Sequence, residues 1–155
     1  MAQDIGRSRG GRSSKIHVVV NEKGLLIQAV ITGGHVHDSQ AIPALFEAGL
    51  NAPLAIVADK AYGSKAIRQQ IADEGALAVI PSKSNAKTPI PHDPSLYAMR
   101  NIVERFFGRM KDMRRLATRF EKLSRNFLAM LHLFAIRQWC NCVHTLEELS
   151  GRLFK

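Results

Sequence analysis

The stretch YAMRNIVERFFGRMKDMRR, Tyr97–Arg115, has an amphipathic helical pattern that decides the interpretation of the whole sequence. At about 100° per residue on an α-helix, four polar side chains fall within an arc of roughly 60°. They are Tyr97, Arg100, Glu104 and Lys111. The opposite side of the helix is apolar, with Ile102, Val103, Phe106, Phe107, Met110 and Met113. The pattern predicts one helix with an apolar back in a core and a front that presents one carboxylate, two cations and a phenol.

The front of this helix has the chemistry of a metal site that handles phosphate. Glu104 offers the hard oxygen ligands that Mg²⁺ prefers. Arg100 and Lys111 could bind phosphate oxygens. The alternative is a solvated surface helix on which the same charges form i, i+4 pairs, and the helical pattern alone leaves both interpretations open.

The spacing of the four polar residues resembles a known signature. Tyr, two residues, Arg, three residues, Glu, six residues and Lys is the Y-x2-R-x3-E-x6-K motif of DDE-type bacterial insertion-sequence transposases, matched without a gap. Three further blocks occur in that family's order: GRSRGGRSSKIH at 6–17, HDS at 37–39 and IVADKAYGS at 56–64. The resemblance is to insertion-sequence families four and five, and it extends from Ile5 to about Trp139.

The resemblance implies an α/β, ribonuclease H-like mixed sheet flanked by helices, and phosphoryl transfer on DNA. Two Mg²⁺ or Mn²⁺ ions would activate the attacking and leaving oxygens. Asp59, at the end of a short strand, and Glu104 are the implied catalytic carboxylates and metal ligands. Arg100 and Lys111 would place the DNA phosphate, with Tyr97 beside the scissile group. The implied partners are the insertion-sequence ends and the target DNA.

Members of this family use three acidic residues, the first of which lies on a central strand upstream of the GRSRGG block. Asp4 has no strand-forming run around it, and Asp38 is better explained as a helix cap. We therefore expect the C-terminal part of a transposase, without the first strand and the first Asp. Either the chain is active only when joined to an upstream segment, as translational frameshifting would allow, or it is an inactive DNA-binding product that regulates transposition.

The charge of the chain also favours a nucleic-acid partner. Its formal net charge is +9, with 22 Lys and Arg against 13 Asp and Glu, and its pI is about 10.1. Such a balance predicts a polyanionic partner, with DNA ahead of an anionic membrane. Arg7, Arg9 and Arg12 are candidate phosphate contacts, with a solvated arm as the alternative. A basic RNA-binding protein is a third hypothesis, and it leaves the four ordered motifs unexplained.

Local patterns place the motifs on one partial transposase domain over residues 15–149, which follows a flexible basic arm at 1–14. Strands are expected at 15–21, 25–32, 54–58 and 77–80. Besides the helix that begins near Tyr97, helices are expected at 40–48, at about 64–73 with Ser64 as the cap, and at about 124–149. The last helix is strongly apolar, and we expect it to pack across the sheet or to form an interface.

The remaining candidates are weaker. His35 and His37 could form a metal pair at a strand end, but polar residues that close a strand explain them as well. Trp139 is expected in the core rather than as a base-stacking platform. Cys140 and Cys142 point to different helix faces, which predicts neither a disulfide nor a metal site and fits a reducing bacterial cytoplasm. Nucleoid association and a homo-oligomer are further expectations, and no apolar run reaches the ~20 residues of a membrane span.

Overall fold

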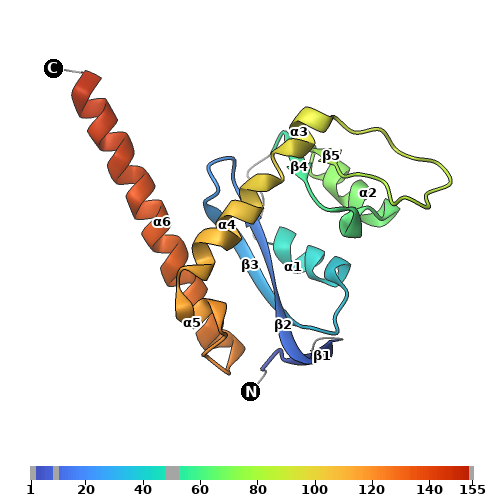
Figure 1. The fold of residues 1–155 in the computed structure, drawn as a ribbon. Coiled ribbons are helices and arrows are strands. Elements are labelled where there is room, and N and C mark those ends of the chain that lie inside the picture. Colours follow the sequence, from blue (N-terminus) through green and yellow to red (C-terminus); the bar gives the residue numbers. More distant parts are fainter. Residues whose placement is uncertain (1–2, 9–10, 48–52, 154–155) are drawn as a thin grey trace.

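The computed structural model describes residues 3–8, 11–47 and 53–153 (Figure 1). Its strands form two separate sheets. An antiparallel sheet has the order β1–β2–β3, with β1 at Gly6–Ser8, β2 at Gly11–Val20 and β3 at Leu26–Gly33. A parallel pair joins β4, Ala55–Val57, to β5, Leu77–Val79. The expected α/β class and mixed strand directions are confirmed.

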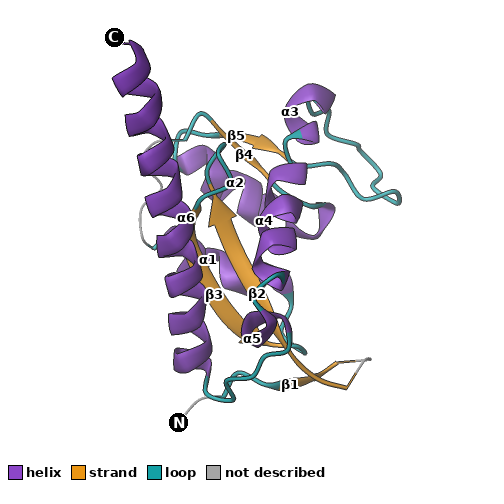
Figure 2. Cartoon of the chain, turned by 60° about the vertical axis from the view of Figure 1, so that its left-hand side comes forward, coloured by secondary structure: helices purple, strands orange, loops and turns teal. Residues whose placement is uncertain are grey.

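Helices flank both sheets. Two short 3-10 helices are η1 at Asp38–Ala41 and η2 at Lys60–Tyr62. The α-helices are α1 at Ile42–Phe46, α2 at Lys65–Asp73, α3 at Pro94–Ala98, α4 at Asn101–Lys111, α5 at Arg114–Ala117 and α6 at Ser124–Leu153. Figure 2 shows the long α6 running beside the β2–β3 hairpin and extending beyond the rest of the chain. None of the helices in the described ranges is long and apolar enough to cross a membrane.

The β2–β3 hairpin separates two apolar clusters because successive side chains of a strand point to opposite faces. The first core lies between this hairpin and the helices α4, α5 and α6, and partly buried Ile16 and Val18 pack against it. The second core lies on the other face and joins α1, α2 and β5, with Val19 packed against it. The first core contains Leu26, Ala29, Phe106, Met110, Leu116, Phe127, Leu131, Phe134 and Ala135. The second contains Ala41, Ile42, Leu45, Phe46, Ile67, Ile71, Ala76 and Ile80.

The helix expected from Tyr97 onward is divided into three parts. Tyr97 lies on α3, and Arg100 is the N-cap residue of α4. The link between them uses i→i+3 hydrogen bonds, such as Arg100 N to Tyr97 O at 2.9 Å. The chain leaves the helical conformation again at Met113, whose ψ is 96°. Helical periodicity missed these breaks because a tight i→i+3 link keeps apolar side chains on roughly the same side.

The segment expected to be a flexible arm, residues 1–14, contains β1 and the first four residues of β2 in its described part. β1 pairs with the start of β2, from Gly6 opposite Ser13 to Ser8 opposite Gly11. Glycine and serine have low strand propensity, so their sequence pattern gave no strand signal. From Ser14 onward β2 pairs with β3, and this pairing keeps the chain extended through the polar residues at the start of β2.

Several other expected elements are confirmed with small shifts. Ser64 caps α2, because its Oγ accepts a hydrogen bond from Ile67 N at 3.3 Å. The helix expected at 40–48 is α1 preceded by η1, and residue 48 lies outside the described residues. The last helix packs on β3, as expected, but Trp139 is 41% exposed rather than in the core. Its indole Nε1 donates to Leu26 O at 2.9 Å, which ties the middle of α6 to the sheet.

Candidate active site

Glu104 and Arg100 form an ion pair at the start of α4. Arg100 Nη2 lies 2.5 Å from Glu104 Oε1, and the Glu104 side chain is 56% exposed. Burial lowers the pKa of Arg100, but the hydrogen bond and the charge of Glu104 outweigh it, so the pKa is raised above its ordinary value. The Tyr97 ring lies beside the same guanidinium, with 5.9 Å from Arg100 Cζ to the ring centroid. The i, i+4 pair considered for a surface helix is therefore present.

Asp59 lies two residues after the end of β4 and serves as the N-cap of η2. Its Oδ1 accepts a hydrogen bond from Ala61 N at 3.2 Å. The residue is exposed, and the charge of its carboxylate contributes to the raised pKa of Arg100. Both carboxylates therefore favour the charged form of Arg100, Glu104 through direct contact and Asp59 only through its charge.

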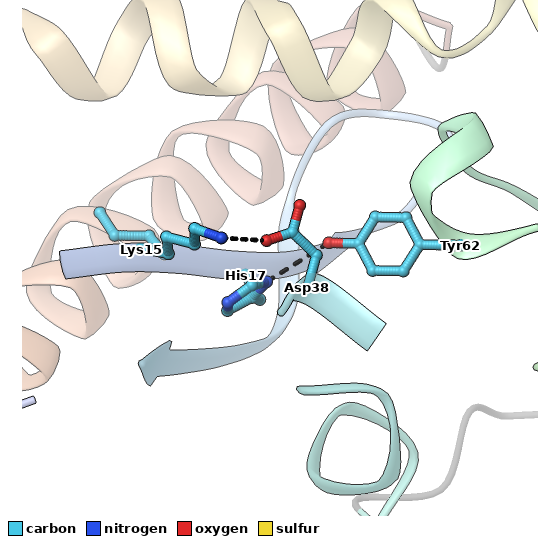
Figure 3. Close-up of a pocket in the computed structure, with 5 residues that line it drawn as sticks. Lys15, His17, Asp38 and Tyr62 are labelled. Carbon is cyan, nitrogen blue, oxygen red and sulfur yellow. Dashed lines mark hydrogen bonds and ion pairs between the residues drawn. The ribbon is translucent and has the colours of Figure 1, made fainter. Parts of the chain in front are cut away.

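A pocket of about 380 Å³ lies between β2, η1 and η2. Tyr62, which lines it, follows Asp59 by three residues in the sequence. Figure 3 shows its polar side chains, with Lys15 reaching from β2 to Asp38. Lys15 Nζ lies 2.7 Å from Asp38 Oδ1 and also donates to Val36 O at 2.8 Å. Lys15 thus anchors the turn that precedes η1 to the sheet.

His17 and Tyr62 connect β2 to the η2 turn that Asp59 caps (Figure 3). His17 is 4% exposed, and its Nε2 lies 2.8 Å from Thr32 Oγ1 while its Nδ1 lies 3.3 Å from the Tyr62 hydroxyl. Burial lowers the pKa of His17, an effect that Lys15 strengthens and Asp38 opposes. Burial also raises the pKa of Tyr62 to about 12, assisted by the charges of Asp38 and Asp59. Near neutral pH the pair is an uncharged tether.

Two family profiles, each described as a transposase DDE domain, match this chain at residues 2–93 and 56–152. The chain belongs to the DDE transposase family. The "Putative transposase for insertion sequence element IS6501" of Brucella ovis is 32% identical over 131 residues, which cover 82% of this chain and 98% of that protein. The corresponding protein for insertion sequence element IS402 of Burkholderia cepacia is 32% identical over 126 residues. That match covers 75% of this chain and 56% of the relative, and no solved structure matches.

Membership of the DDE transposases implies use of a divalent metal, and the donor chemistry of two residues fits one. Asp59 and Glu104 are both exposed carboxylates, which provide the hard oxygens that Mg²⁺ and Mn²⁺ bind. Over the described ranges, however, no three His, Cys, Asp or Glu side chains come close enough to hold an ion together. The residues present therefore fit part of a metal site.

One sequence-based expectation at the start of η1 is wrong, and the structure does not support the weaker alternative for His35 and His37. Asp38 is not the cap of this helix, because His37 takes that position and its Nδ1 accepts from Ser39 N at 3.3 Å. Asp38 instead forms an ion pair with Lys15 of β2, a contact between separate elements that local sequence patterns do not reveal. His35 and His37 do not form a metal pair, because His37 is used as the cap and His35 packs beside the glycines of β1 and β3.

The basic residues assigned to phosphate binding lie at several places in this transposase. Lys111 is exposed at the end of α4, and Arg12 is exposed near the start of β2. Both line a second pocket at the N-terminal end of β2. Arg7 is exposed on β1, and Arg9 lies outside the described residues. Sequence reasoning missed His17 and Tyr62, although Tyr62 stands in the same motif block as Asp59.

Proposed function

We propose that this chain contributes Asp59 and Glu104 to the active site of a transposase that cleaves insertion-sequence DNA and joins it to a target. The observation that carries the proposal is that two separate motif blocks of the family each supply an exposed carboxylate: Asp59 after β4, and Glu104 on α4, where it pairs with Arg100. The net charge of +9 supports a polyanionic substrate.

Each residue then has a specific task. Asp59 and Glu104 would hold Mg²⁺ or Mn²⁺, which would activate the attacking and leaving oxygens of an in-line displacement. Glu104 would give up Arg100 when it takes the metal, and the released guanidinium could bind the scissile phosphate through two parallel hydrogen bonds. Tyr97 would hold Arg100 in place from α3. The exposure of the ion pair makes this exchange of partners inexpensive.

We further propose that an upstream segment completes the site with a third acid and completes a ribonuclease H-like sheet. Unpaired strand edges support this step. Gly34 N donates to Ser13 O, so alternation along β2 directs the backbone groups of Ile16 and Val18 away from β3. The ladder with β1 reaches only Ser13, and these groups lie beyond it.

β4 has an open edge as well. Leu77 N donates to Leu54 O and Ala58 N donates to Val79 O, so the backbone groups of Ala55 and Val57 point away from β5. An added extended strand could pair with β2, with β4, or with both, because an open edge is a template for another strand. A carboxylate on such a strand beside β4 would lie near Asp59, which follows the same strand.

The proposal is tested by joining the chain to an upstream transposase segment and measuring Mg²⁺-dependent cleavage and strand transfer of insertion-sequence DNA. We expect activity from the fusion, little from the chain alone, and loss to background in Asp59→Asn and Glu104→Gln with DNA binding retained. Equal cleavage by the chain alone would refute the need for a third acid. Activity that survives both substitutions would refute the assigned carboxylates.

A DNA-binding regulator without catalytic activity is the second candidate function. The ion pair of Glu104 with Arg100 favours it, because in this arrangement one oxygen of Glu104 is already engaged. This alternative predicts DNA binding that is unchanged in Glu104→Gln and a fusion that never cleaves. The same cleavage assay therefore separates the two functions.

A further inference from the structure

A second pocket, of about 580 Å³, lies where the start of β2 meets α4, α5 and α6. Three of the residues that line it are cations: Arg12, Lys111 and Arg119. Its lining includes no carboxylate among the described residues. A concave surface with this donor set favours an anionic ligand.

Arg119 is fixed in the wall of this pocket and has donor capacity to spare. Its guanidinium Cζ lies 4.4 Å from the centroid of the Phe127 ring, and its Nη2 donates to Gln3 O at 2.7 Å. Its Nε and Nη1 are buried without an acceptor in the described part of the chain. Burial lowers the pKa of Arg119, and Asp4 opposes this effect. Leaving charged donors unpaired costs free energy, which an anion would recover.

The backbone is strained on both sides of this contact. Asp4, with φ at 43°, and Arg119, with φ at 48°, are the only residues other than glycine with a positive φ in the described ranges. Gln3, the neighbour of Asp4, accepts the hydrogen bond from Arg119. Side chains other than glycine adopt this conformation at a cost, and such residues concentrate at ligand sites and switches. The carboxylate of Asp4 is thus held near a basic pocket.

We propose that this pocket binds a phosphate of the DNA backbone and that the charge of nearby Asp4 opposes this binding. The inference rests on the proposed function for DNA as the substrate. Lys111 follows Glu104 by seven residues on α4, a rise of about 10.5 Å. The pocket would therefore hold a backbone phosphate other than the scissile one. The phosphate takes the place of Gln3 O on Nη2 and, with Gln3 displaced, reaches the buried Nε and Nη1 as well.

The test measures the affinity of the whole chain for a fluorescent 20-base-pair duplex by anisotropy, in EDTA and at several salt concentrations. Arg119→Gln is expected to weaken binding about tenfold at low salt and to reduce the slope of log affinity against log salt by about 0.9. Asp4→Asn is expected to tighten binding severalfold, because Asn tolerates the same backbone conformation without the charge. Lys23→Gln, which removes one charge at the β2–β3 turn, is the matched control.

Arg12→Gln tests the pocket independently of Arg119→Gln. Arg12 is exposed, so its substitution should leave the fold intact. Weaker binding in Arg12→Gln together with tighter binding in Asp4→Asn supports the pocket even where Arg119→Gln unfolds in circular dichroism. The proposal is overturned if both arginine variants bind like Lys23→Gln, or if Asp4→Asn leaves the affinity unchanged. A wild-type chain that fails to bind DNA overturns this inference and the proposed function together. The expected pattern with a fusion that never cleaves would leave the pocket standing and refute only the catalytic role.

Discussion

The two carboxylates of the candidate site have different structural support. Glu104 lies on α4, whose opposite side places Phe106 at 0% and Met110 at 5% exposure in the first core. Asp59 follows β4, a strand of three residues that are all only half-buried and that pair on one side alone. The helix holds its carboxylate through deep packing. The segment around Asp59 has only the partial burial of Ile56, Ala58 and Tyr62 against the second core and the His17–Tyr62 contact.

This difference indicates where the site can move. Elements with few buried apolar contacts and solvent-exposed backbone open at lower free energy than a packed core. The Asp59 side is therefore the part that a partner strand would stabilise, and the Glu104 side is the preformed part. The predictions below test this contrast, beginning with the largest expected effect.

The Glu104 side should lose much of its stability when the buried ring of Phe106 is removed. Phe106→Ala leaves a cavity in the first core, and we expect a loss of about 3–5 kcal/mol in the free energy of unfolding. Urea denaturation followed by circular dichroism measures it. Leu133→Ala, at a position that is 58% exposed on α6, is the control and should change stability by less than about 0.5 kcal/mol. Similar losses in the two variants would show that α4 is not held by the first core.

The two strand edges should differ in amide hydrogen exchange. The amides of His17 and Val19 face β3 and should be protected, whereas those of Ala55 and Val57 face the open edge of β4 and should exchange at least tenfold faster. Mass spectrometry or NMR at neutral pH would measure the rates. Addition of the upstream segment should slow the β4 amides. Equal protection of both sets in the isolated chain would contradict the contrast.

The His17–Tyr62 tether on the Asp59 side should contribute measurably to the free energy of unfolding. Tyr62→Phe removes the hydroxyl that meets His17 Nδ1 in a half-buried position, and we expect a loss of about 1 kcal/mol in unfolding free energy. Tyr97→Phe removes a hydroxyl for which no hydrogen bond is recorded within the described ranges, and it should be close to neutral. A Tyr62 variant as stable as the Tyr97 variant would mean that the tether does not hold the η2 turn.

The sequence predicted the Glu104 side better than the Asp59 side for a physical reason. Helical periodicity identified the apolar back of α4, and Phe106 and Met110 are indeed buried. Strand alternation located β2 and β3 because half-buried strands repeat every two residues. The pairing of Lys15 with Asp38 and the contact of His17 with Tyr62 join separate elements, so no local pattern reports them. For the same reason the sequence suggested that Asp38 caps a helix, and the structure corrected it.

The tether should also make stability depend on pH. The pKa of His17 is lowered in the folded chain from 6.5, so the unfolded chain takes up the proton first as the pH falls. The contribution of His17 is therefore fully present above about pH 6.5 and is lost progressively below it. Denaturation midpoints between pH 7.5 and 5 should fall less in His17→Gln than in the wild type. His132→Gln, at an exposed position on α6, should keep the wild-type slope.

The ion pair of Arg100 with Glu104 should contribute only slightly to the free energy of unfolding. Arg100 and Glu104 have side chains that are 33% and 56% exposed, so solvent screens their attraction. A double-mutant cycle with Arg100→Gln, Glu104→Gln and the double variant should give a coupling of about 0.2–0.5 kcal/mol, and less at high salt. A weak coupling means that Glu104 can exchange Arg100 for a metal ion at little cost. A coupling well above about 1 kcal/mol would instead mean that the carboxylate is held by the guanidinium, which would favour the DNA-binding regulator over the enzyme.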